Sequence, residues 1–186
     1  LIQRILEIRM RWMETRNNLF GQSLATIWGF ERGANILADD EVNAAAISPD
    51  HYRCFVLPYH LEYARHFDDI YFHSCGKLDP MYSLISTIPN LKTVDVGPFS
   101  TFDKALVAFG ERVIYERNYS VELTPFDPGL QNELRTLMQT ARERGVFVYV
   151  LLDVDTCTEA ANRRTTGWID AVRQIRDEFF PPQVIT

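Results

Sequence analysis

The seven apolar residues of 146-VFVYVLL-152 limit the folds open to this chain more than any other stretch. A short run of β-branched, aromatic and leucine side chains is typical of a strand. Because no polar residue interrupts the run, both faces of the strand are expected to be buried, as they are in a parallel sheet covered by helices. The run therefore predicts an α/β protein built on a parallel sheet.

The rest of the chain repeats a pattern of strand and helix. Short β-prone segments alternate with apolar residues at helical spacing, and the strand starts lie about one βα unit apart. This alternation fits either an open doubly wound sheet or part of a (β/α)8 barrel. Strands are predicted at 34–37, 70–72, 92–96, 112–116 and 146–152, and helices at 1–18, from 48 onward with an interruption near 58, and at 81–88, 102–109, 131–144 and 166–180.

Composition narrows the class of protein. The 186 residues, 46% of them hydrophobic, can form one core, so a single domain over 1–186 is expected. The net charge of -6 argues against a nucleic-acid or membrane-surface binder, and no segment approaches the roughly 18 apolar residues of a membrane-spanning helix. Three cysteines, Cys54, Cys75 and Cys157, cannot all pair within the chain, which favours a reducing cytoplasm.

Polar side chains follow the predicted strands at the point where each strand ends. The carboxyl ends of parallel strands meet at one edge, where active sites of βα proteins are built. A shared site is the interpretation we favour; the alternative is that solvent simply begins at these ends. The residues in question are Asp39, Asp40, His73, Cys75, Asp95, Glu116, Arg117, Asn118, Asp153, Asp155 and Cys157.

The segment 70-IYFHSCGK-77 contains the most specific signal. Residues at i and i+2 of a strand point to the same face, so His73 and Cys75 are expected to face one point. One imidazole and one thiolate suit zinc, although a core cysteine beside a hydrogen-bonded histidine is the alternative that spacing alone favours. Cys157, after the last strand, is a candidate third ligand, and its presence favours the zinc site over the structural alternative. Cys54 is predicted to be a buried thiol.

Five further residues are assigned to catalysis or substrate binding. Asp39 and Asp40 are either a helix cap with a solvated neighbour, or acid/base and ligand-orienting carboxylates, and we predict the catalytic role. Glu116 and Arg117, placed at the end of the fourth strand, are predicted to bind substrate. Tyr59 is given the same role, with core packing as its alternative.

Three segments together resemble a known family. They are 33-GANILADDEVNAAAISPDHYRCFVLPY-59, 73-HSCG-76 and 88-IPNLKTVDVG-97. Their order, a strand ending in acids, then Ser-Pro, Leu-Pro-Tyr and H-x-C-G, resembles the uroporphyrinogen decarboxylase superfamily. The chain is most similar to its branch of corrinoid-dependent, zinc-containing methyltransferases and their uncharacterised relatives, over about residues 26–172.

The resemblance implies a (β/α)8 TIM barrel, which needs about 250 residues. Five strands correspond to the C-terminal portion of such a barrel, about five βα units, with roughly three units missing before a helix that is already under way at Leu1. The missing part would come from another segment of a longer protein or from a second subunit, as in a homodimer.

The resemblance also implies a reaction. In the methyltransferase branch, zinc held by residues matching His73, Cys75 and Cys157 binds a small thiol substrate, and the thiolate attacks a methyl group carried on the corrinoid of a partner protein. Residues 155–159 lack the glycines expected around that cysteine, so Asp153 or Asp155 is an alternative ligand. Two other functions stay open: a tetrapyrrole decarboxylase, which needs no metal, and a metal-binding barrel without catalysis.

Overall fold

The structure is a computed structural model, and it describes residues 2–20, 35–38, 42–120, 126–154 and 158–181. The predictions for Asp39, Asp40, Asp155 and Cys157 concern residues outside these ranges.

A single sheet organises the fold, and its five strands are all parallel. The α/β class with a parallel sheet is therefore confirmed. The strands lie side by side in chain order: β1 (Asn35–Ala38), β2 (Ile70–His73), β3 (Leu91–Val96), β4 (Ile114–Ser120) and β5 (Val148–Asp153).

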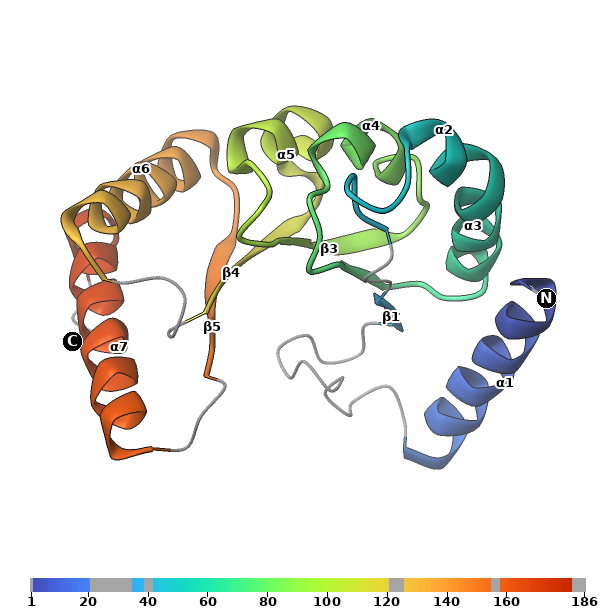
Figure 1. Cartoon of the computed structure of the whole chain (residues 1–186), viewed down its shortest axis with the longest axis horizontal. Helices are drawn as coiled ribbons and strands as arrows, with labels where there is room; N and C mark the ends of the chain where they lie inside the picture. The colour runs from blue at the N-terminus through green and yellow to red at the C-terminus, as the bar shows by residue number, and fades with distance from the viewer. Residues whose placement is uncertain (1, 21–34, 39–41, 121–125, 155–157, 182–186) are drawn as a thin grey trace, which may run out of the picture.

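Helices connect successive strands, and those from α2 to α6 form an arc over one side of the sheet (Figure 1). Ser48 caps the first of this series, as its position before Pro49 predicts: its side chain accepts a hydrogen bond from the His51 N–H. The helices are α1 (Ile2–Phe20), α2 (Pro49–His51), the π-helix η1 (Tyr52–Val56), α3 (Leu57–Arg65), the 3₁₀ turn η2 (Asp79–Met81), α4 (Tyr82–Ile85), α5 (Phe102–Phe109), the 3₁₀ turn η3 (Gly110–Arg112), α6 (Pro128–Arg144) and α7 (Glu159–Phe179).

The strand order distinguishes between the two architectures that the sequence leaves open. A doubly wound sheet reverses its order at a switch point and carries helices on both faces. Here the order is sequential, and the connecting helices lie on one side (Figure 1). This arrangement is that of consecutive βα units of a barrel, with β1 and β5 at the two edges of the sheet in the part of the chain that the structure describes.

The main hydrophobic core lies between the sheet and its helices. Phe72, Val94 and Tyr115, from the three central strands, are fully buried there. A second cluster, which includes Leu134 and Trp168, packs α6 and α7 together. Strand residues that alternate with Phe72 and Val94 consequently point to the other face of the sheet, which is where the polar side chains gather.

Strand β4 is longer than the sequence pattern predicts. The pattern indicates a strand over 112–116, but the strand runs from Ile114 to Ser120 and pairs with β5 from Tyr115 onward. The polar stretch after Tyr115 looks like a strand end, yet Glu116 and Arg117 pair with both β3 and β5, and the pairing with β5 continues to Ser120. The placement of Glu116 and Arg117 at a strand end is therefore wrong: both lie within β4, on opposite faces of the sheet.

Strand β5 is half-buried along its length, so the prediction that both its faces are buried is wrong for this structure. The reason is its position, because an edge strand in the described part of the chain has a neighbour on one side only. Cys54 is also exposed rather than buried, on the π-helix η1.

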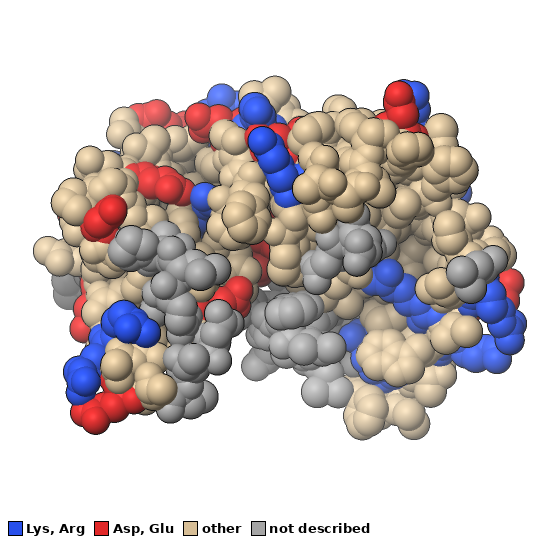
Figure 2. All heavy atoms as spheres, in the orientation of Figure 1, with Lys and Arg blue, Asp and Glu red and all other residues tan. Residues whose placement is uncertain are grey.

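Charged side chains of both signs are interspersed over the upper helices in Figure 2, whereas basic side chains gather over α1 at the lower right, and the basic residues of α1 are all arginines. No helix among the described residues is both long and apolar enough to cross a bilayer.

Candidate metal centre

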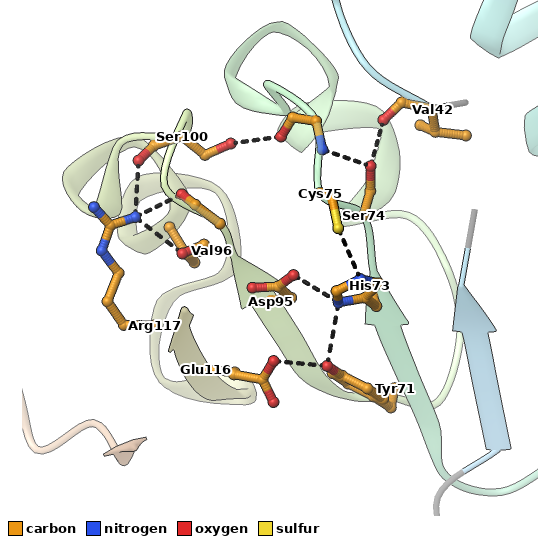
Figure 3. Close-up of polar contacts among 12 residues, drawn as sticks. Val42, Tyr71, His73, Ser74, Cys75, Asp95, Val96, Ser100, Glu116 and Arg117 are labelled. Carbon is orange, nitrogen blue, oxygen red and sulfur yellow. Dashed lines mark hydrogen bonds and ion pairs between the residues drawn. The ribbon is translucent and has the colours of Figure 1, made fainter. Parts of the chain in front are cut away.

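Polar side chains from neighbouring strands form a row on the face of the sheet opposite the main core. His73 ends β2, one residue beyond the Phe72–Val94 pair, so that it lies level with Asp95 on β3. Asp95 is in turn paired with Glu116 on β4, and Glu116 with Tyr149 on β5. Because paired residues of parallel strands share a face, the sheet register brings these four side chains together (Figure 3 shows the first three).

The two nitrogens of His73 have different surroundings. Nδ1 lies 2.7 Å from Asp95 Oδ2 and 3.4 Å from the Tyr71 hydroxyl oxygen. The Tyr71 hydroxyl donates its proton to Glu116 Oε1 at 2.8 Å, so it can only accept from the imidazole. Nδ1 therefore carries the ring proton, and Nε2 keeps the lone pair that a metal ligand needs.

Cys75 lies on the Nε2 side of this ring. Its Sγ is 3.4 Å from His73 Nε2, so the structure brings the two residues of the H-x-C motif together (Figure 3). His73 is buried, whereas Cys75 is exposed. An imidazole that donates its other N–H to a carboxylate is the usual arrangement around protein-bound zinc, because the carboxylate sets the tautomer and the ring orientation.

Acidic side chains surround the Nδ1 side. His73, Asp95 and Glu116 each offer a ligand atom, and these atoms lie within 4.8 Å of one another. Burial raises the pKa of Asp95, against the lowering effect of His73. Burial also raises the pKa of Glu116, although the hydroxyls of Tyr149 and Tyr71 both donate hydrogen bonds to it. A cation close to these carboxylates would offset the cost of burying them.

These donors fit a zinc ion. Zinc takes imidazole nitrogen and thiolate sulfur, which are the atoms that His73 Nε2 and Cys75 Sγ present, while Asp95 lies at the opposite ring nitrogen and can orient the imidazole. Asp95 is fully buried, and among the described residues its carboxylate has the ion-pair contact with His73 but no hydrogen bond that satisfies either oxygen, so positive charge on a metal-bound imidazole would offset the cost of burying it.

Local packing explains the glycine of the H-x-C-G motif. The Gly76 N–H donates to Ser74 Oγ at 3.1 Å, and Ser74 Oγ donates to the Val42 carbonyl at 2.9 Å. A Cβ atom on Gly76 would lie only 1.8 Å from the Cβ of Asn43. Glycine is thus required because the segment after β1 packs directly against the loop that carries Cys75.

The other predicted site residues are not gathered at this point. Tyr59 lies half-buried on α3, where it packs against the main core on the helix-covered side of the sheet, away from the face of His73. Arg117 also points to the helix side, and its guanidinium binds main-chain carbonyls. The substrate-binding role of both stays a prediction, whereas Glu116 does reach the row that contains His73.

Sequence reasoning missed two residues of this centre, Tyr71 and Tyr149. Tyr71 lies two positions before His73, so strand periodicity alone could have placed it on the same face. Tyr149 could not have been found in this way, because its contact with Glu116 depends on the register between β4 and β5. Asp95 belongs to the polar residues that the sequence places at strand ends, but the sequence pattern gives it no specific role.

Comparisons with known proteins add one result on the fold. No protein-family model and no curated protein matches the chain. Among solved structures, a methyltransferase from Methanosarcina mazei is similar, with a TM-score of 0.54 and 21% sequence identity. The match covers 78% of this chain and 42% of that protein, so the chain spans less than half of its length. A likeness at this identity shows that the two proteins share a fold.

Proposed function

We propose that this chain forms the metal-binding part of a zinc-dependent enzyme that transfers a methyl group from a corrinoid carrier to a thiol. The observation that carries the proposal is the position of Cys75 Sγ, 3.4 Å from His73 Nε2, with Asp95 on the opposite nitrogen. The shared fold with a methyltransferase supports it.

Each residue has a separate part in the proposed reaction. His73 Nε2 and Cys75 Sγ bind the ion, Asp95 holds the imidazole in place, and Cys157 supplies a third ligand. When bound, zinc supplies the Lewis acidity that lowers the pKa of a coordinated thiol, so that the thiolate is available at neutral pH. The new bond joins the thiol sulfur to the methyl carbon, the cobalt–carbon bond breaks with its electron pair left on cobalt, and the thiol proton leaves to solvent.

Three of the remaining predicted residues also have a part in this proposal. Asp39 and Asp40 follow β1, whose last residue Ala38 is paired with His73, and we assign them to orienting ligands or accepting protons. Glu116, close to the metal ligands, is assigned to the substrate.

We also propose that further βα units complete the barrel. Edge strands β1 and β5 leave backbone N–H and C=O groups without a strand partner in the described structure, and α1 exposes Ile5, Ile8 and Trp12. In the full-length protein, amide hydrogen exchange along β5 should then be as slow as along β3. Fast exchange along β5 alone would contradict closure of the sheet.

The direct test of function is a methyl-transfer assay on the full-length protein, with a methylated corrinoid protein and a series of thiols. Cys75→Ser should lower the transfer rate at least about 100-fold, because the thiolate ligand is lost. Cys54→Ser is the matched control, since Cys54 is exposed on a helix of the other side, and it should leave the rate unchanged. Zinc bound without transfer to any thiol would favour a metal-binding barrel, and transfer that survives Cys75→Ser would contradict the assigned ligand.

A further inference from the structure

Arg117 binds the main chain of the loop after β3. Its side chain is only 8% exposed, and Nη1 donates to the carbonyls of Val96 at 2.9 Å, Gly97 at 2.6 Å and Ser100 at 3.2 Å. Three carbonyls from one turn converge on this nitrogen only if the turn keeps its present shape. The guanidinium therefore holds residues 96–100 in one conformation.

The guanidinium is itself held from the side of α6. Nη2 donates to Glu133 Oε1 at 2.8 Å, and Nε donates to the Tyr119 hydroxyl oxygen at 3.2 Å. That hydroxyl donates to the same Glu133 oxygen at 2.8 Å, and the Arg117 guanidinium carbon lies 4.9 Å from the centre of the Tyr119 ring. Each of its three nitrogens is engaged in contacts within the chain, which favours a structural role for Arg117.

The loop that Arg117 holds is in turn joined to the loop that carries Cys75. Ser100 Oγ accepts from the Leu78 N–H at 2.9 Å and donates to the Gly76 carbonyl at 3.3 Å (Figure 3 shows the second contact). The two loops also pack closely at Gly97, where a Cβ atom would lie 3.5 Å from the Ser74 carbonyl oxygen and 3.9 Å from that of Cys75. A continuous path of contacts thus connects Arg117 with the peptide groups on both sides of Cys75.

We propose that Arg117, held by Glu133, is a positioning residue that sets the place of the Cys75 thiolate relative to His73. The inference rests on the proposed zinc site and extends it to residues on the opposite face of the sheet. Cys75 is exposed and lies outside β2, so its loop contacts determine where Sγ lies. Metal ligands must be held within about 0.5 Å of their working geometry, which a loop achieves only through such supports.

The test uses cobalt(II) as a spectroscopic probe in the full-length protein, because a thiolate bound to cobalt gives a charge-transfer absorption. Arg117→Ala should raise the Kd for cobalt about tenfold or more and weaken the thiolate band. Arg117→Lys should restore part of the cobalt affinity and part of the thiolate band. A cavity of about 360 Å³, lined in part by Arg117 and Glu133, lies beside the contact, so added guanidinium ion should also restore part of the band in Arg117→Ala.

Arg112→Ala is the matched control. The Arg112 guanidinium also donates to main-chain carbonyls, those of Phe109 at 3.2 Å and Ala108 at 3.3 Å, but just before the start of β4, at the end away from Cys75. Its loss should leave cobalt affinity and the thiolate band unchanged.

The outcomes separate the two proposals. A wild-type protein without a thiolate band, or a band that is as strong in Cys75→Ser as in wild type, would overturn the proposed metal site and this inference with it. If wild type shows the band, and Arg117→Ala has the same band intensity and the same Kd for cobalt, only the positioning role is overturned. If Arg117→Ala does not fold, Ser100→Ala removes the link to Gly76 and Leu78 with a smaller change, and an unchanged band in that variant would overturn the inference equally.

Discussion

The imidazole Nδ1 of His73 lies 2.7 Å from Asp95 Oδ2, and both side chains are buried. This contact leaves the opposite nitrogen facing Cys75. A carboxylate on β3 therefore sets the ring orientation of a histidine on β2, and with it the nitrogen that is available to a metal.

Asp95→Asn tests this relationship. The amide can still meet the Nδ1 proton through its oxygen, but the negative charge that favours the metal-bound imidazole is gone. We expect zinc affinity to fall about 10- to 100-fold. Competition with a chromophoric chelator measures it, and Asp103→Asn, an exposed carboxylate on α5, serves as the control. Equal affinity in Asp95→Asn and wild type would show that Asp95 does not support a metal ligand.

Gly76→Ala should destabilise the protein by about 1–3 kcal/mol, because the new Cβ would lie 1.8 Å from the Cβ of Asn43 and one of the two segments must move. Gly167→Ala is the opposite case. Gly167 lies inside α7, and an added Cβ atom there would have no neighbour within 4 Å, so alanine should stabilise the protein by about 0.5–1 kcal/mol. Urea unfolding measures both, and a neutral Gly76→Ala would contradict the packing of Asn43 on this loop.

The pH dependence of stability should reveal Asp79. Its carboxylate accepts from the Thr101 N–H at 2.7 Å, the Thr101 hydroxyl at 2.8 Å and Lys104 at 3.0 Å. Burial raises the pKa of Asp79, but these hydrogen bonds and the Lys104 charge together outweigh it and hold the pKa below its usual 3.8. A depressed pKa in the folded state stabilises the protein above the unfolded pKa, and this contribution is lost as pH falls through the folded pKa.

Asp79→Asn should therefore be less stable than wild type by about 1–3 kcal/mol at pH 7, with the difference shrinking below about pH 4. Urea unfolding at pH 7, 5, 4 and 3 measures the difference. A gap that stays constant down to pH 3 would count against the carboxylate contacts.

A double-mutant cycle tests the contact between Tyr149 and Glu116. The Tyr149 hydroxyl donates to a carboxylate that is 1% exposed, so Tyr149→Phe should cost about 1–3 kcal/mol in unfolding free energy. In a Glu116→Gln background the cost should be smaller, with a coupling energy of about 0.5–3 kcal/mol. Additive effects would mean that the two side chains do not interact in solution.

Local patterns predicted much of the fold. Helix α5 occupies 102–109 as expected, and Ser48 caps the helix that its position before Pro49 indicates. The H-x-C spacing also predicts that His73 and Cys75 face one point, and the structure brings them together, although Cys75 lies beyond the end of β2 and its loop contacts help to set the position of Sγ.

Contacts between strands could not be predicted in the same way. The meeting of Asp95 with Glu116 depends on the register of β3 against β4, and the extension of β4 to Ser120 depends on its pairing with β5. Gly76 is expected from the sequence as a turn residue, but its neighbour Asn43 lies 33 positions earlier in the chain, beyond the reach of any local pattern. Such contacts join residues that are far apart in the sequence, and they are set by the pairing of the strands rather than by any local pattern.

The zinc content of the purified full-length protein tests the central claim most directly. The proposal predicts about one zinc per chain by elemental analysis, lost in His73→Ala and in Cys75→Ser and retained in Cys54→Ser. Wild-type protein that binds no zinc at micromolar concentrations of the metal, or that keeps it in both ligand variants, would contradict the proposed centre.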